Sequence, residues 1–241
     1  MSGLDPAAEA AHLTAALRAL AGEPVDPSPI IKTARHFYGA SLDGMKRVAA
    51  VWVGEHRAAG AGEVMALADA LWDAAIREEM VTATMILERR PDARETFGVR
   101  RYDRWAVRLD NWETTDNLGG RVLGPWAATD PGTRLGTLER LAGRRNPWLR
   151  RLALVGCVYL GRREDAATWF PRVGDIVLGL AADREASIPK AISWVLREHT
   201  RHTAAEVAVF LDERAADLPA IAVRETHHKL QTGHKAGRRP S

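Results

Sequence analysis

The stretch Asn146-Pro-Trp-Leu-Arg-Arg-Leu-Ala-Leu-Val-Gly-Cys-Val-Tyr159 is typical of one complete capped helix. Asn146 can accept a hydrogen bond from an otherwise unpaired backbone amide, and Pro147 suits the first helical position, where no amide hydrogen is needed. Arg150 and Arg151 then fall in the first two turns. The apolar run that follows predicts a buried face.

Helix signals of the same kind recur along the chain. Apolar residues return at spacings of three and four, as in Val64, Leu67, Ala68 and Leu71. Glycines and prolines mark the ends of these segments, and alternating apolar and polar runs long enough for strands are missing. The sequence therefore predicts an all-α chain of about a dozen helices joined by short turns.

The helices form a loose repeat. Trp112, Arg151 and Trp194 each lie early in a predicted helix, at intervals of 39 and 43 residues. Two antiparallel helices and their turns occupy about 40–47 residues in HEAT-type arrays, which stack into a curved solenoid with one concave face. We predict a single HEAT-like domain over residues 1–232 and a disordered basic tail over residues 233–241.

Composition excludes several classes of protein. No stretch approaches the roughly 20 apolar residues of a membrane span, and polar residues precede any apolar run at the N-terminus, so no signal peptide is expected. Cys157 has no partner, which favours a buried thiol in a cytoplasmic protein. The pairs His199 with His202 and His227 with His228 suit surface positions, without an HExxH or cysteine-pair motif. We therefore expect neither a metal nor a cofactor.

Charge is unevenly distributed. Residues 223–241 contribute +4 to a formal net charge of +3, which leaves −1 for the rest of the chain. Residues 55–79 are acidic, whereas Glu139 alone opposes eight arginines between residues 134 and 163. One strongly positive flank on a nearly neutral protein is typical of a phosphate-binding face, and solvated helix ends are the alternative.

The segment Asp110-Asn-Trp-Glu-Thr-Thr-Asp116 supplies candidate chemistry. Asp110 as N-cap with Glu113 three residues later predicts a capping box, and Trp112 and Asp116 then share a helix face. An indole beside a carboxylate suits a flat, cationic ligand. Core packing is the alternative for this tryptophan, as we expect for five others: Trp52, Trp72, Trp105, Trp126 and Trp169.

Two later segments add cations and a second indole. Arg151 could bind a phosphate or form a structural ion pair between repeats, and the sequence does not choose between them. Ser187 is a candidate N-cap, after which Lys190, Trp194 and Arg197 fall along one stripe. Trp194 is ambiguous, because its apolar neighbours already supply a core stripe.

Three segments together resemble the AlkD family of bacterial DNA glycosylases. They are Asn111-Trp-Glu-Thr-Thr-Asp116, Asn146-Pro-Trp-Leu-Arg-Arg151 and Ile188-Pro-Lys-Ala-Ile-Ser-Trp-Val-Leu-Arg-Glu198. The upstream segment Phe37-Tyr-Gly-Ala-Ser-Leu-Asp-Gly-Met-Lys-Arg47 is similar to the family's first turn and helix, so that the resemblance spans residues 30 to 230.

The resemblance implies a HEAT-like solenoid with a concave basic DNA-binding face. Such proteins excise 3-alkyladenine and 7-alkylguanine from duplex DNA without flipping the base, and a shallow face could also accept bulky adducts. Asp116, Trp112 and Trp194 would be the catalytic residues. The backbone of the DNA would be held by four cations: Arg151, Arg150, Lys190 and Arg197.

One departure from the family lies near the N-terminus. The family's tyrosine before the first turn is absent from Pro29-Ile-Ile-Lys-Thr33, where Lys32 or Arg35 could contact the DNA backbone instead. We expect a monomeric, nucleoid-associated protein of the cytoplasm acting on duplex DNA with alkylated purines. A non-catalytic HEAT-like binder of branched or distorted DNA is the main alternative, and a protein-binding scaffold is the other.

Overall fold

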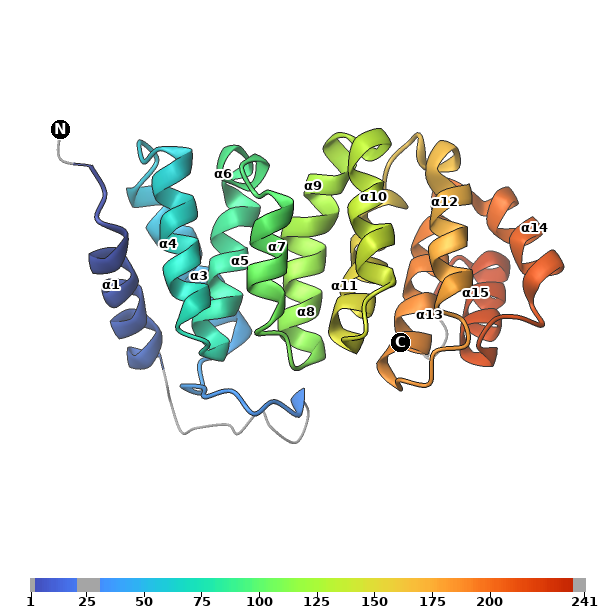
Figure 1. Cartoon of the computed structure of the whole chain (residues 1–241), viewed down its shortest axis with the longest axis horizontal. Helices are drawn as coiled ribbons and strands as arrows, with labels where there is room; N and C mark the ends of the chain where they lie inside the picture. The colour runs from blue at the N-terminus through green and yellow to red at the C-terminus, as the bar shows by residue number, and fades with distance from the viewer. Residues whose placement is uncertain (1–2, 21–30, 236–241) are drawn as a thin grey trace. The chain divides into compact units, whose positions relative to one another are not determined.

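The computed structural model describes residues 3–20 and 31–235. The chain forms two compact units, which we call unit 1 (Met1–Val122) and unit 2 (Leu123–Ser241). Within the described residues every regular element is a helix (Figure 1). The all-α, helical-repeat fold predicted from the spacing of apolar residues is confirmed. The extent of a single domain over residues 1–232 stays a prediction.

Unit 1 is built around α5 (Arg77–Arg89), which α3 (Leu42–Glu55), α4 (Ala61–Asp73) and α8 (Trp112–Leu118) all contact. The apolar series of α4 from Val64 to Leu71 is buried, as its helical spacing predicts. The other helices of this unit are α1 (Pro6–Ala19), α6 (Pro91–Glu95) and α7 (Val99–Ala106). A π-helix, η1 (Gly119–Leu123), directly follows α8.

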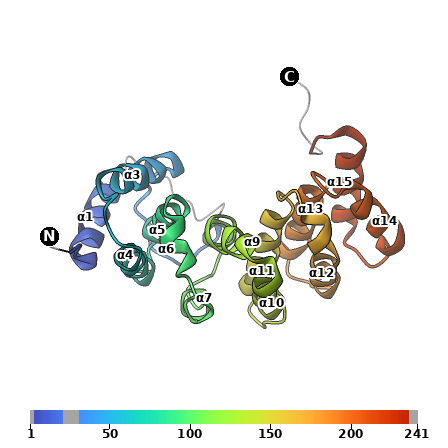
Figure 2. The same cartoon turned by 90° about the horizontal axis from the view of Figure 1, so that it is seen from above.

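Unit 2 consists of stacked helix pairs. It begins with α9 (Gly124–Thr129), and the pairs are α10 (Pro131–Ala142) with α11 (Pro147–Leu160), α12 (Ala166–Gly179) with α13 (Ser187–His199), and α14 (Ala204–Arg214) with α15 (Ala220–Thr232). The first helices α10 and α12 contact each other, and the second helices contact in the order α11, α13, α15 (Figure 2). This is the neighbour-to-neighbour packing of a repeat protein.

Four of the eight tryptophans are buried in the cores. In unit 1 the rings of Trp72 and Trp105 stack with centroids 4.2 Å apart, and the Trp72 indole donates to the Trp105 carbonyl oxygen at 3.0 Å. Trp52 and Trp126 are buried as predicted. Trp169 is only half-buried, so the core prediction is wrong there: its indole donates to Asp165 at 3.2 Å.

Two other buried groups lie in unit 2. Cys157 is buried as predicted, and burial raises the pKa of its thiol. His199 is fully buried against Phe170, so the prediction of a surface histidine is wrong. The spacing of His199 and His202 in the sequence is typical of surface residues. In the fold, however, apolar residues such as Phe170 surround the imidazole of His199.

No helix among the described residues is both long and apolar enough to cross a bilayer.

Of the predicted basic tail, residues 236–241 lie outside the described residues. Gly233 ends α15 with φ at 72°, a left-handed conformation that suits glycine at a helix C-terminus.

Candidate functional site

Helix α8 presents Trp112 and Asp116 on one face. Trp112 is the first residue of the helix and is 37% exposed, and Asp116 follows one turn later, half-buried. The opposite face is buried and consists of Glu113, Thr114, Thr115 and Leu118. The spacing of four residues thus places the indole and the carboxylate on the same accessible side, as predicted.

The start of α8 differs from the predicted capping box. Asn111 is the N-cap, and its side chain accepts from the backbone amide of Thr114 at 3.0 Å. Asp110 instead accepts from the Thr33 hydroxyl at 3.0 Å and from the Ala34 amide at 3.1 Å. Asp110 therefore ties the loop at residues 31–41 to the beginning of α8, a role that local spacing could not reveal.

Glu113 is a buried anchor. Arg77 at the start of α5 donates from Nε and Nη2 to the two carboxylate oxygens of Glu113, at 2.6 and 2.7 Å. This pair was not predicted from the sequence, because Arg77 lies in the stretch 55–79, whose charge indicates only an acidic segment. Although burial lowers the pKa of Arg77, Glu113 and Glu78 raise it above its usual value.

The loop before α3 holds the two candidate substitutes for the family's tyrosine. Arg35 faces the protein, because its Nη2 donates to the carbonyl oxygen of Arg108 at 2.7 Å and its Nε lies 3.6 Å from Asp110. Lys32 is exposed and adopts φ of 52°. Of the two, Lys32 is the more accessible to a phosphate.

In unit 2, Asn146 and Pro147 start α11 as predicted, and the Asn146 side chain accepts from the Trp148 amide at 2.9 Å. Arg151 is only 7% exposed and donates from Nη1 to the carbonyl oxygen of Ser187 at 2.6 Å. This bond joins α11 to the first residue of α13. The guanidinium thus makes a hydrogen bond between repeats to a neutral carbonyl oxygen, and a role of Arg151 in phosphate binding stays a prediction.

Arg150 also has an internal partner. Its Nε and Nη2 donate to the Asp183 carboxylate at 2.5 and 3.2 Å. Burial acts to raise the pKa of Asp183, but the hydrogen bonds from Arg150 and the Glu185 amide, together with the charge of Arg150, lower that pKa overall. Other arginines of the basic flank are paired as well, Arg162 with Glu198 and Arg163 with Asp165.

Helix α13 carries the third group of candidates. Lys190 is exposed and Trp194 is half-buried, whereas Ile192, Ser193 and Val195 are fully buried, so Lys190 and Trp194 lie on the less buried side of the helix. Two expectations about this helix are wrong. Ser187 is the first helical residue after the N-cap Ala186, and Trp194 lies in the middle of the helix.

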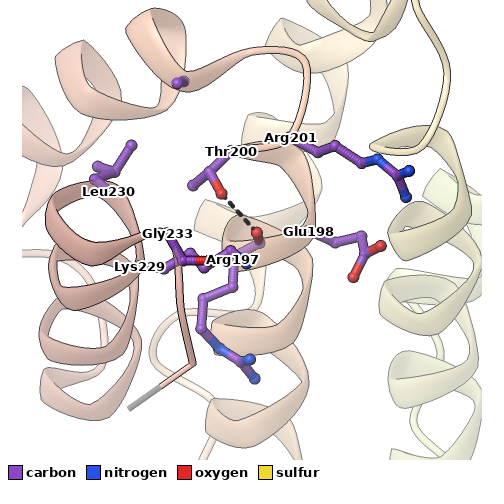
Figure 3. A pocket seen from close by; sticks show the side chains of 8 residues that line it. Arg197, Glu198, Thr200, Arg201, Lys229, Leu230 and Gly233 are labelled. Carbon is purple, nitrogen blue, oxygen red and sulfur yellow. Dashed lines mark hydrogen bonds between the residues drawn. The ribbon is translucent and has the colours of Figure 1, made fainter. Parts of the chain in front are cut away.

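Arg197 completes this stripe. Its Nε donates to the Ser193 hydroxyl at 3.1 Å and lies 3.4 Å from Glu225, and burial lowers the pKa of its guanidinium. Beside it, a cavity of about 460 Å³ opens where α13 and α15 end (Figure 3). Arg201 and Lys229 add positive charge to its lining, while Glu198 is paired with Arg162. Such a lining suits a phosphate better than an apolar group.

The candidate residues are divided between the two units. Trp112 and Asp116 lie in unit 1, and the group in unit 2 comprises Arg150, Arg151, Lys190, Trp194 and Arg197. Their convergence on one DNA-binding face stays a prediction. Among the described residues, no group of three or more histidine, cysteine or carboxylate side chains could hold a metal ion.

Comparison with known proteins identifies the family. A search of curated proteins found no significant match. A family model described as DNA alkylation repair enzyme matches residues 15–230, which include α8, α11 and α13. The chain therefore belongs to the DNA alkylation repair enzyme family.

Proposed function

We propose that this protein is a monofunctional DNA glycosylase that excises cationic N-alkylated purines from duplex DNA, as the first step of base excision repair. Its substrates are 3-alkyladenine and 7-alkylguanine, including bulky adducts. The observation that carries the proposal is the accessible face of α8, where Trp112 and Asp116 lie one turn apart in a chain of the alkylation repair family.

The chemistry needs little more than a placed carboxylate. Alkylation of a purine ring nitrogen makes the base cationic and a good leaving group, so that protonation by a general acid is not required. Breaking the glycosidic bond develops positive charge on the deoxyribose, as in glycoside hydrolysis. An ionised Asp116 beside the sugar stabilises that charge and orients the attacking water.

The aromatic and cationic residues hold the DNA in this proposal. Trp112 and Trp194 pack against the sugar and backbone, where an electron-rich ring face attracts a developing cation. Lys190 and Arg197 hold phosphates and fix the register of the duplex. Arg150 and Arg151 reach phosphates only if DNA competes with their contacts to Asp183 and Ser187.

Recognition without base flipping is part of the proposal, and the exposure of α8 supports it. Most glycosylases gain selectivity by moving the base into a pocket. Here Trp112 and Asp116 lie on an accessible helix face, and a base that stays in the duplex has no pocket wall to fit. Adduct size is therefore a weak constraint, and the positive charge of the modified base provides the selectivity.

The direct test is release of free base from a duplex treated with a methylating agent. We expect 7-methylguanine and 3-methyladenine in the soluble fraction and an equal number of abasic sites in the DNA, without strand cleavage. Salt-sensitive binding to a four-way junction, with no base released from methylated duplexes, would instead support the non-catalytic binder of branched DNA.

Phosphate contacts can be counted from the salt dependence of binding. Replacing Lys190 by alanine should reduce the slope of log K against log salt by about 0.9, the value for one phosphate contact on B-DNA. Lys190 is exposed, so the melting temperature should stay unchanged. The control is Lys46→Ala on α3, where Lys46 pairs with Asp43 at 3.2 Å. Equal slopes for wild type and Lys190→Ala would remove Lys190 from the interface.

A further inference from the structure

We propose that Arg77 and Glu113 are positioning residues whose buried ion pair sets the direction in which α8 presents Trp112 and Asp116. The catalytic part of this proposal rests on the function proposed above. Neither residue touches the DNA in this scheme. They act through the orientation of the helix that carries the reacting carboxylate.

Arg77 and Glu113 form a bidentate ion pair, which we call the clamp. Both donors of the fork, Nε and Nη2, meet the two oxygens of Glu113 at 2.6 and 2.7 Å, and each residue is at most 7% exposed. A planar guanidinium bound through two parallel hydrogen bonds fixes direction as well as distance. Glu113 is the residue after Trp112 and lies three before Asp116.

The clamp continues into the loop before α3. Nη1 of Arg77 donates to the Ala40 carbonyl oxygen at 3.2 Å and to Glu78 at 3.0 Å. Glu78 in turn accepts from the backbone amides of Tyr38 and Gly39 at 2.9 and 3.0 Å. Arg77 therefore joins α8 to the loop before α3, each of which lies more than thirty residues from it in the sequence.

Helix α8 needs such an anchor. It has seven residues and continues directly into the π-helix η1, and its buried face packs on α5, so the contact with α5 contributes to fixing its direction. A buried ion pair gives little net stability relative to apolar residues of similar size, but it can specify one geometry. Because a displacement of about 1 Å can slow a reaction roughly 100-fold, the geometry of α8 matters more to the rate than to the fold.

The test replaces the whole pair. In Arg77→Met/Glu113→Leu the buried Glu78 loses its contact with Arg77 but keeps the hydrogen bonds from the Tyr38 and Gly39 amides. We therefore expect a folded protein with a lowered melting temperature and a DNA affinity close to that of the wild type. The single-turnover excision rate should fall about 10- to 100-fold with KM little changed. The control, Arg172→Gln/Glu139→Gln, removes an exposed pair 2.7 Å apart in unit 2 and should keep the wild-type rate. A folded double variant with the wild-type rate would overturn the proposal.

A milder variant covers the case in which the double variant does not fold. Glu113→Asp keeps the charge pair but shortens the side chain by one methylene, so α8 must move toward Arg77 to keep its hydrogen bonds. We expect a folded protein with a reduced kcat, and restoration of the rate only by glutamate. A wild-type kcat for Glu113→Asp would contradict a positioning role.

A second readout does not depend on catalysis. In protein labelled with 5-fluorotryptophan, the Trp112 resonance is identified by its loss in Trp112→Phe. It should shift or broaden in Arg77→Met/Glu113→Leu and stay in place in the control. An unmoved resonance in the folded double variant overturns the positioning role. A moved resonance in a protein whose wild type releases no base supports that role and refutes the proposed glycosylase.

Discussion

Replacing Asp116 by asparagine should abolish most base excision while the protein still folds and binds methylated DNA. Asparagine has nearly the same shape as aspartate, and residue 116 is half-buried at the accessible face of α8, so packing should not change. The negative charge that would stabilise the sugar cation is lost. Removing one such electrostatic contact typically slows a reaction about 100- to 1,000-fold, and we expect a decrease in this range for single-turnover release of 7-methylguanine.

The measurement needs a matched control and a binding readout. Asp212→Asn changes an exposed aspartate on α14 and should leave excision, affinity and melting temperature unchanged. Asp116→Asn should keep its affinity for methylated duplex within a factor of about two. The charge of Asp116 acts on the cation that develops in the transition state, whereas affinity depends on contacts that already exist in the bound ground state. Excision by Asp116→Asn at the rate of Asp212→Asn would exclude Asp116 as the catalytic carboxylate.

The fold was predictable because its signals are local. Spacings of three and four between apolar residues predict the buried face of α4, and Asn146 with Pro147 predicts the start of α11 to the residue. In a repeat protein each helix packs mainly against its sequence neighbours, so local periodicity carries most of the tertiary information. The neighbour contacts of α11, α13 and α15 are of that kind.

The site was predictable only where it depends on spacing within one helix. Trp112 and Asp116, four residues apart, share a face of α8, and Lys190 and Trp194 share one of α13. The Arg77–Glu113 clamp was not predictable, because it joins residues 36 positions apart across two helices. The prediction that Asp110 is the N-cap was wrong for the same kind of reason. Its hydrogen-bond partners Thr33 and Ala34 are distant in the sequence and lie beside it only in the folded chain.

Acid should destabilise unit 2 through His199. This residue is fully buried, its Nε2 lies 3.1 Å from the Cys157 carbonyl oxygen, and its Nδ1 has no hydrogen-bond partner among the described residues. The Phe170 ring lies 5.3 Å away, and a side chain at Gly161 would collide with the imidazole. Burial lowers the pKa of His199 to about 4, although the contact with Cys157 and the charge of Glu198 act in the opposite direction.

The sign follows from where the proton binds. The unfolded chain takes up a proton near the ordinary histidine pKa of 6.5, whereas the folded protein does so only near pH 4. Between these values the unfolded state binds more protons, so the free energy of unfolding falls as the pH is lowered through this window. The loss is about 1.4 kcal/mol per pH unit, or about 3 kcal/mol by pH 4.

Urea unfolding of the wild type and His199→Gln at pH 7 and pH 4.5 isolates this contribution. Glutamine can still donate to the Cys157 carbonyl oxygen but cannot be protonated, so the variant should lose about 2 to 3 kcal/mol less than the wild type between the two pH values. Other titrating groups are common to both proteins and cancel in the comparison. An equal loss in the two proteins would mean that His199 is protonated in the folded state as readily as in the unfolded chain. Its imidazole would then have to reach solvent by local opening of α13, the helix that carries Lys190 and Trp194.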